Sequence, residues 1–234
     1  MSILIGYFEQ FIFVFSLIFI HELGHFETAR LLKFEVDKIY LYPTGGISKF
    51  TSQINVSWLK ELLVLINGPL MQCITYLLLF NYYPYDRSLD FLKYIHYSIL
   101  LFNLLPIYPL DGGKIINLIL SLFFSYRSSF NITIIISYII IIVLALFLPF
   151  YFKINYIFMI LFLLYKVHEA NKEKKYYFDK FLLERYLYSY SFNKICIVKS
   201  IKDFKRGCMH IINDKDGVFF EKDKLNKVFM LQKK

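Results

Sequence analysis

A run of apolar residues at positions 11–20 leads without interruption into three ionisable side chains, His21, Glu22 and His25. An ionisable side chain inside a membrane helix costs about 2.5–3.5 kcal/mol even on the lenient insertion scale. Several of them so close together therefore require a compensating partner, and a divalent metal ion is the obvious one.

The spacing of these residues supports a metal site. Residues four apart share one face of a helix, so His21 and His25 stack one turn apart and can bind the same zinc ion. Glu22 is offset around the helix, where it can take a proton from the water that the metal activates. This is the H-E-x-x-H pattern of zinc metalloproteases. The alternative is a chance match on a soluble helix, and the apolar surroundings argue against it.

The composition indicates a membrane protein. The chain of 234 residues is 57% hydrophobic and 20% aromatic, which is too apolar for a soluble domain of this length. About 20 apolar residues are needed to cross the hydrocarbon core. The sequence therefore predicts about five spans, the third of them interrupted by Pro106 and Pro109, at residues 11–32, 62–83, 95–124, 132–148 and 154–167.

Basic residues predict the orientation in the membrane. Residues 168–234 contain 16 Lys and Arg against 9 Asp and Glu, so they carry +7 of the net charge of +9. Positive segments stay on the cytosolic side. We therefore expect an integral, multi-pass protein with a cytosolic tail, and five spans place the amino terminus outside.

These observations predict an all-α polytopic membrane protein with a membrane-embedded domain at residues 1–167 and a cytosolic tail at residues 168–234. The tail is expected to begin with an amphipathic juxtamembrane helix at residues 168–190. A small α/β piece should follow it, with a strand at residues 195–198 and a hairpin that pairs residues 209–212 with 218–220.

A short β-hairpin is predicted between Val36 and Phe50, where the pattern alternates loosely around Gly45 and Gly46. We expect the hairpin to be re-entrant, dipping toward the membrane. Its exposed edge could pair with an extended substrate by strand addition, which makes the two glycines candidate substrate contacts. A plain surface hairpin is the alternative.

A third metal ligand is required, because catalytic zinc sites usually have three protein ligands. The best candidate is Asp111, which follows Pro106 and Pro109 and precedes two glycines in the segment NLLPIYPLDGGK. Broken backbone at membrane depth is tolerated where it is buried or lines a wet cavity. A solvated turn at the membrane surface would explain Asp111 alone, but the histidine pair favours the ligand.

HELGH in one span and N-x-x-P-x-x-P-L-D-G in another resemble the site-2 protease family of intramembrane zinc metalloproteases, peptidase family M50. The short motifs at residues 43–46 (PTGG) and 67–69 (NGP) fall where that family carries similar ones. The motifs LDGGK, FLLERY and FKRGC, at residues 110–114, 181–186 and 204–208, further resemble the sporulation branch, the stage IV sporulation protein FB type.

The resemblance implies a zinc-dependent endopeptidase with the metal held by His21, His25 and Asp111. Glu22 would act as general base and then as proton donor to the leaving amine. Asn103 would orient the substrate or stabilise the oxyanion, with an interhelical hydrogen bond as the alternative. The implied substrate is a membrane-associated protein, a sigma-factor precursor cut near the cytosolic face during sporulation. Membrane inhibitor subunits are implied as partners, and direct nucleic-acid binding is not.

The sequence departs from the family pattern at both ends. The sporulation enzymes carry a further span before HELGH, and their tail is a regulatory cystathionine-β-synthase-type module. Residues 168–234 are expected to form a truncated version of it. The sequence has two rival interpretations, a metal transporter and an inactive membrane scaffold. A metal transporter would spread ligands along a path, yet the chain has only five histidines, and an inactive membrane scaffold would not need the intact Glu22.

Overall fold

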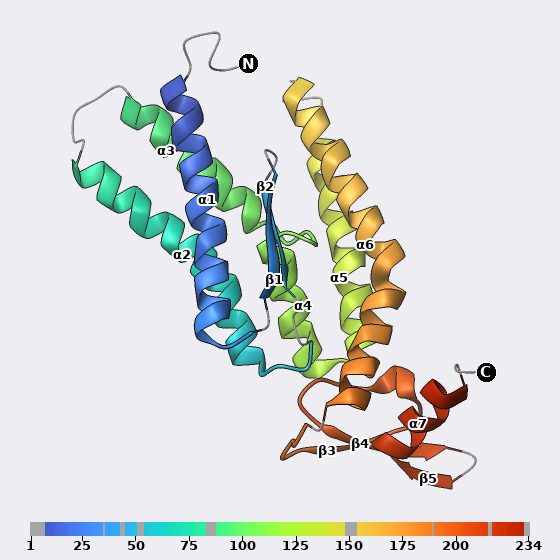
Figure 1. The fold of residues 1–234 in the computed structure, drawn as a ribbon. Coiled ribbons are helices and arrows are strands. Elements are labelled where there is room, and N and C mark those ends of the chain that lie inside the picture. The colour runs from blue at the N-terminus through green and yellow to red at the C-terminus, as the bar shows by residue number, and fades with distance from the viewer. Residues whose placement is uncertain are drawn as a thin grey trace. The chain divides into compact units, whose positions relative to one another are not determined.

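The computed structural model describes residues 8–34, 36–42, 45–50, 54–82, 88–147, 154–188, 190–214 and 217–231. The chain forms two compact units. One comprises residues 1–52 and 59–105, and the other comprises residues 53–58 and 106–234. Helices make up most of the described chain, as predicted (Figure 1).

The described residues of the first unit form three helices and a hairpin: α1 (Phe8–Leu31), β1 (Val36–Tyr42), β2 (Gly45–Phe50), α2 (Trp58–Tyr82) and α3 (Ser88–Asn103). The helices share a small core made by Leu17 of α1, Tyr76 of α2 and Leu92 of α3. Helix α1 approaches α2 closely at Gly24, where an added Cβ would lie 2.6 Å from the carbonyl oxygen of Asn67. A glycine at this position therefore lets the two helices pack backbone against backbone.

The predicted hairpin is confirmed. Strands β1 and β2 are antiparallel, with Tyr42 opposite Gly45 and Leu41 opposite Gly46. The residues between the strands lie outside the described part of the chain. Among the described residues no third strand joins this sheet, so the hairpin retains backbone groups that could pair with another strand.

Within the part of the second unit that the structure describes lie four helices, a short 3-10 helix and three strands: α4 (Asp111–Phe123), α5 (Tyr126–Leu146), α6 (Ile154–Leu187), β3 (Ile195–Val198), η2 (Ile201–Asp203), β4 (Met209–Asp214), β5 (Gly217–Phe220) and α7 (Glu221–Leu231). Helices α5 and α6 lie side by side (Figure 1). The strands form one sheet in the order β3-β4-β5, with β3 parallel and β5 antiparallel to β4. The predicted strand and hairpin of the tail are thus confirmed.

The core of the second unit joins the tail to the ends of the long helices. It consists of buried side chains from the segment before α2, from α5, α6, the tail sheet and α7: Ile54, Tyr126, Phe181, Leu182, Val198, Phe204, Ile212 and Leu225. Tyr126 stacks on Phe181 with ring centroids 4.4 Å apart. The tail is therefore packed into the same core as the helices of its unit.

A buried polar network accompanies this core, centred on Arg185 of α6. Its guanidinium donates to Oδ1 of Asn55 at 2.7 Å and to Oε1 of Glu221 at 2.8 Å. It also donates to the backbone carbonyls of Cys208 and Lys205, each at 3.0 Å. Buried charges are stabilised by such pairing and hydrogen bonding, so Arg185 ties together three segments that are distant in sequence.

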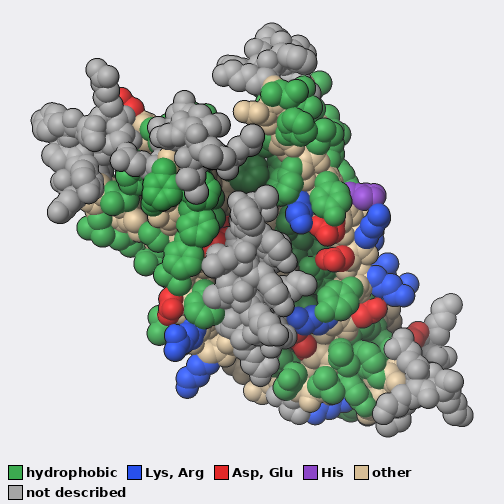
Figure 2. Space-filling model, turned by 45° about the horizontal axis from the view of Figure 1, so that its top comes forward, with side chains coloured by type: hydrophobic (Ala, Val, Ile, Leu, Met, Phe, Trp, Pro, Cys, Tyr) green, Lys and Arg blue, Asp and Glu red, His purple; other side chains and the backbone are tan. Residues whose placement is uncertain are grey.

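Helix α5 buries three hydroxyl side chains and exposes a largely apolar face along most of its length. Ser129, Thr133 and Ser137 are buried, and their hydroxyls donate to the carbonyls of Tyr126, Ser129 and Thr133. Its exposed face is apolar and includes Ile135, Ile139, Ile142 and Leu146. Figure 2 shows many hydrophobic side chains on the surface of the molecule. This pattern is typical of a helix that faces lipid.

The five predicted spans are not confirmed. Among the described residues, three helices are long and apolar enough to cross a membrane, at residues 11–31, 58–79 and 126–146. The segment predicted as one long span at residues 95–124 is two helices, α3 with 16 residues and α4 with 13. Proline donates no backbone hydrogen bond and keeps the preceding residue out of the helical conformation, so Pro106 and Pro109 separate them.

Helix α6 also differs from the prediction. The predicted fifth span and the juxtamembrane helix are one continuous helix of 34 residues, because no proline or glycine interrupts residues 154–187. The predicted domain boundary between residues 167 and 168 falls inside this helix and stays a prediction.

Candidate metal centre

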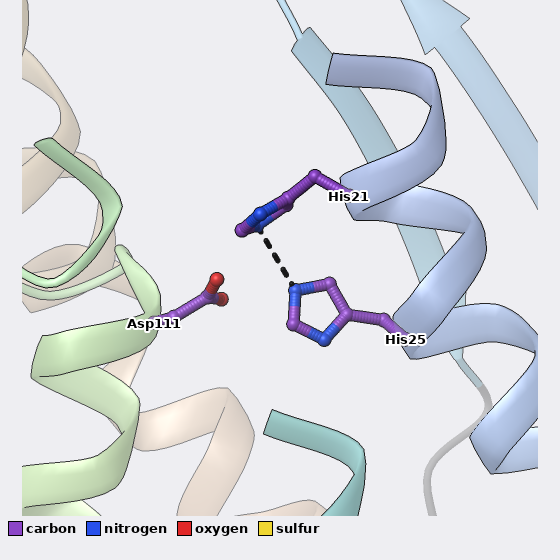
Figure 3. Close-up of side chains that lie close together, drawn as sticks. All are labelled: His21, His25 and Asp111. Atoms are coloured by element: carbon purple, nitrogen blue, oxygen red, sulfur yellow. Dashed lines mark hydrogen bonds between the residues drawn. The ribbon is translucent and has the colours of Figure 1, made fainter. Parts of the chain in front are cut away.

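His21 and His25 lie on one face of α1, one turn apart, and both are buried, with 2% and 6% of their surface exposed. Their rings meet edge to face with centroids 4.9 Å apart. Their Nε2 atoms are 3.2 Å apart (Figure 3). The helical spacing of the sequence thus brings two imidazole nitrogens to one point.

The other ring nitrogen of each histidine faces helix α2. The Nδ1 atom of His25 is 2.8 Å from the carbonyl oxygen of Val64, and the Nδ1 atom of His21 is 3.1 Å from Oε1 of Gln72. A carbonyl oxygen can only accept, so Nδ1 of His25 carries the proton and Nε2 presents a lone pair. This tautomer is the one that a metal ligand needs.

The packing of α1 on α2 is held by a short chain of polar groups. The side-chain amide of Asn67 donates to the hydroxyl of Thr28, which in turn donates to the carbonyl of Gly24 at 2.8 Å. These contacts lie beside the histidine pair in sequence and fix the register of the two helices. The NGP segment noted in the sequence thus supports the helix that carries the histidines.

Asp111 is the first residue of α4 and is 5% exposed. The segment before it is held by the amide of Tyr108, which donates to the hydroxyl of Ser137 at 2.9 Å. Gly113 packs directly against the backbone of Ile107, where no larger side chain fits. Lys114 lies 3.5 Å from the Asp111 carboxylate. A carboxylate in the first turn also interacts favourably with the helix dipole.

In the described part of the chain, the residues that could hold a metal ion as a group of three or more are His21, His25 and Asp111, all of them buried. Figure 3 shows the two imidazoles on α1 and the carboxylate on the first turn of α4. Two imidazoles and one carboxylate are a donor set found in catalytic zinc sites.

The geometry of the histidine pair fits zinc. A tetrahedral zinc ion with Zn–N bonds of about 2.0–2.1 Å separates its two nitrogens by roughly 3.3 Å. The Nε2 atoms of His21 and His25 are 3.2 Å apart. The spacing of the pair therefore matches that of two imidazole ligands on one zinc ion.

The remaining predicted site residues occupy less distinctive positions. Glu22 is partly buried beside His21, and Asn103 is the partly buried last residue of α3. Gly45 and Gly46 begin β2. The roles given to these residues stay predictions. The sequence reasoning missed Gln72, although an amide side chain in an apolar span was a signal that could have identified it.

An H-E-x-x-H helix with both histidines buried in an apolar setting, together with a buried aspartate, defines a membrane-embedded metalloprotease. The chain belongs to peptidase family M50, whose family model matches residues 10–86 and 83–148. The family predicted from the motifs is therefore confirmed.

Individual relatives agree with this assignment. The chain is 27% identical to stage IV sporulation protein FB of Bacillus subtilis (strain 168), over 93% of this chain and 81% of that protein. It is 33% identical to a zinc metalloprotease of Methanocaldococcus jannaschii, over 52% of this chain and 37% of that protein. The solved site-2 protease from Methanocaldococcus jannaschii superimposes with a TM-score of 0.56 at 28% identity and covers 68% of this chain and 76% of that one.

The chain is thus an integral membrane protein and a zinc-dependent endopeptidase of the site-2 protease type. The predicted zinc cofactor agrees with both the relatives and the donor set of His21, His25 and Asp111.

Proposed function

We propose that this protein cuts a membrane-associated protein near the cytosolic face, with His21, His25 and Asp111 as zinc ligands and Glu22 as the catalytic base. The observation that carries the proposal is the buried histidine pair, whose Nε2 atoms face each other 3.2 Å apart. Two buried imidazole nitrogens at this distance, each beside a second-helix acceptor at its other ring nitrogen, are the arrangement that a shared cation uses.

The roles of the side chains follow from their chemistry. When bound, zinc lowers the pKa of water to about 7 and polarises the scissile carbonyl. Glu22 takes the proton from the attacking water and then delivers it to the leaving amine. Asn103 donates a hydrogen bond to the substrate or to the developing oxyanion. The buried carboxylate of Asp111 would complete the ligand set and offset one of the two positive charges of the cation.

The β1–β2 hairpin is the proposed substrate-binding element. A peptide bond inside a helix is shielded, so the substrate must be extended before it is cut. An open edge of the two-stranded sheet offers backbone groups for strand addition. Gly45 and Gly46 leave room for the backbone of the substrate beside β2.

The likeness to stage IV sporulation protein FB supports a narrower proposal. The substrate is a sigma-factor precursor that is released during sporulation, and membrane inhibitor subunits hold the enzyme inactive until that stage. We also propose five membrane crossings, an external amino terminus and a cytosolic tail at residues 168–234. The excess of basic residues in the tail supports this orientation.

The experiment is coexpression of the protein with a candidate sigma-factor precursor. Wild type should cleave the precursor, and Glu22→Gln should abolish cleavage while retaining bound zinc. Glu27→Gln is the matched control, since Glu27 is an exposed residue of the same helix and should leave cleavage unchanged. Equal cleavage by Glu22→Gln and wild type would refute the mechanism.

A further inference from the structure

We propose that Gln72 is the positioning residue that decides which nitrogen His21 presents to the metal. The inference rests on the proposed role of His21 as a zinc ligand. Gln72 lies on α2, is fully buried, and lies between His21 of α1 and His96 of α3. Three helices of the first unit thus meet at one amide side chain.

The contact with α3 fixes the orientation of the Gln72 amide. One end of the amide is 3.0 Å from the backbone carbonyl oxygen of His96. Since a backbone carbonyl can only accept a hydrogen bond, the Nε2 group of Gln72 must face His96 as the donor. The Oε1 atom is therefore the end of the amide that faces His21, 3.1 Å from its Nδ1.

The orientation of Gln72 in turn fixes the tautomer of His21. An amide oxygen accepts and cannot donate, so Nδ1 of His21 must carry the proton. A neutral imidazole has one proton, which leaves a lone pair on Nε2. The carbonyl of Val64 imposes the same tautomer on His25. Two lone pairs then face each other across 3.2 Å, an arrangement that a cation between them stabilises.

His96 of α3, the last member of the hydrogen-bonded series from His21 through Gln72, is itself held in place. His96 is buried, and its ring stacks on Tyr76 of α2 with centroids 4.1 Å apart and an angle of 8° between the planes. Stacking on the same helix that carries Gln72 keeps the His96 carbonyl within reach of the amide. The acceptor for His21 is thus supported by α3, which contributes no metal ligand.

The first test is the zinc affinity of the full-length protein in detergent, measured by competition with a chromogenic chelator. Gln72→Leu removes the acceptor and should weaken zinc binding by about 10–100-fold, the usual effect of losing such a partner. Gln72→Glu keeps an acceptor for His21 and should retain most of the affinity. Thr75→Val is the control, because the Thr75 hydroxyl bonds only to Met71 of its own helix among the described contacts.

A spectroscopic readout separates positioning from loss of structure. The cobalt-substituted Gln72→Leu protein should show altered visible absorption bands, whereas Gln72→Glu and Thr75→Val should match wild type. Unchanged zinc affinity and an unchanged cobalt spectrum in Gln72→Leu would overturn the inference.

The inference can also be tested on wild type, in case Gln72→Leu does not fold. Nitrogen NMR of protein labelled in the histidine rings reports which ring nitrogen carries the proton, and the His21→Gln variant identifies the signal of His21. The proton of His21 should lie on Nδ1. A proton on Nε2 of His21 in zinc-loaded protein would refute the role of Gln72. Failure of the proposed function looks different: wild type would then hold no zinc that depends on His21.

Discussion

Gly68 of α2 lies directly against the imidazole of His25, so closely that a Cβ at residue 68 would overlap Cε1 and Nε2 of the ring. The ring is also held by the bond between its Nδ1 and the carbonyl of Val64, one turn earlier on α2. The glycine of the NGP segment therefore provides the space in which one proposed zinc ligand sits.

Gly68→Ala should displace the His25 ring and weaken zinc binding, because the added methyl and the imidazole cannot occupy the same space. We expect the zinc content after dialysis against a chelator to fall well below that of wild type. Elemental analysis gives the measurement. Gly207→Ala serves as a control with open space around the residue, although its positive φ of 69° makes it mildly strained. A fully zinc-loaded Gly68→Ala protein would contradict this prediction.

Gly113→Ala should act on the proposed ligand Asp111, two residues before it in α4. Its Cβ would overlap the backbone of Ile107 and Tyr108, which cannot move aside as a flexible side chain can. We expect the start of α4 to shift and proteolytic activity to fall by more than tenfold, since a displacement of about 1 Å can cost about 10²-fold in rate. The cleavage assay described above measures this. Activity close to wild type would show that the packing of Gly113 does not position Asp111.

Removing Arg185 should destabilise the tail strongly. Arg185→Met leaves Glu221 buried without its cationic partner, and breaking a buried pair in this way typically costs about 3–5 kcal/mol. The melting temperature of the full-length protein, followed by circular dichroism, should fall by several degrees or more. The double variant Arg185→Met with Glu221→Gln should recover part of the loss, since it removes the unpaired charge. A double variant no more stable than the single one would count against the ion pair as the cause.

The pH dependence of tail stability should report on His210. Burial, together with the nearby Arg185 cation, lowers the pKa of His210, although the Glu221 carboxylate opposes the shift. The Nε2 atom of His210 accepts a hydrogen bond from the amide of Lys205 at 2.9 Å, and protonation would break this bond.

The direction of the pH effect on stability follows from the difference between the pKa of His210 in the folded and unfolded states. Because the folded pKa lies below the usual 6.5, the neutral ring stabilises the tail above that pH, and the contribution is lost as the pH falls through the folded value. The melting temperature of wild type should therefore exceed that of His210→Gln most at pH 7 and above, with the difference shrinking toward pH 5. Burial raises the pKa of Glu184, so this residue also makes stability depend on pH. Because Glu184 is present in both proteins, its effect largely cancels in the difference between them. If the difference in melting temperature between wild type and His210→Gln grew toward acidic pH, the stabilising role of the neutral His210 ring would be refuted.

Local patterns allowed much of this structure to be predicted. The alternation around Asp216-Gly217 was enough to predict the tail hairpin, and the four-residue spacing of His21 and His25 was enough to predict their stacking. The prolines at residues 106 and 109 were noticed, yet the length of the apolar run outweighed them, and one span was predicted where two helices form.

Contacts between distant residues were beyond the sequence reasoning. Glu184 accepts from the amide of Ile54 at 2.6 Å across 130 positions of the chain, and Gln72 meets His21 across 51. No periodicity or motif encodes such pairs, because they depend on how whole helices pack. The sequence was therefore enough to predict the candidate ligands, whereas the contacts around them, such as that of Gln72 with His21, required the fold.

The uninterrupted course of α6 has a practical consequence for dissecting this enzyme. A truncation after residue 167 would cut through the middle of a helix and strip Ile54 and Tyr126 of the side chains that bury them. The tail therefore cannot be removed without exposing part of the core of its unit. Loss of activity in a truncated protein could then result from destabilisation of the remaining helices as readily as from loss of regulation.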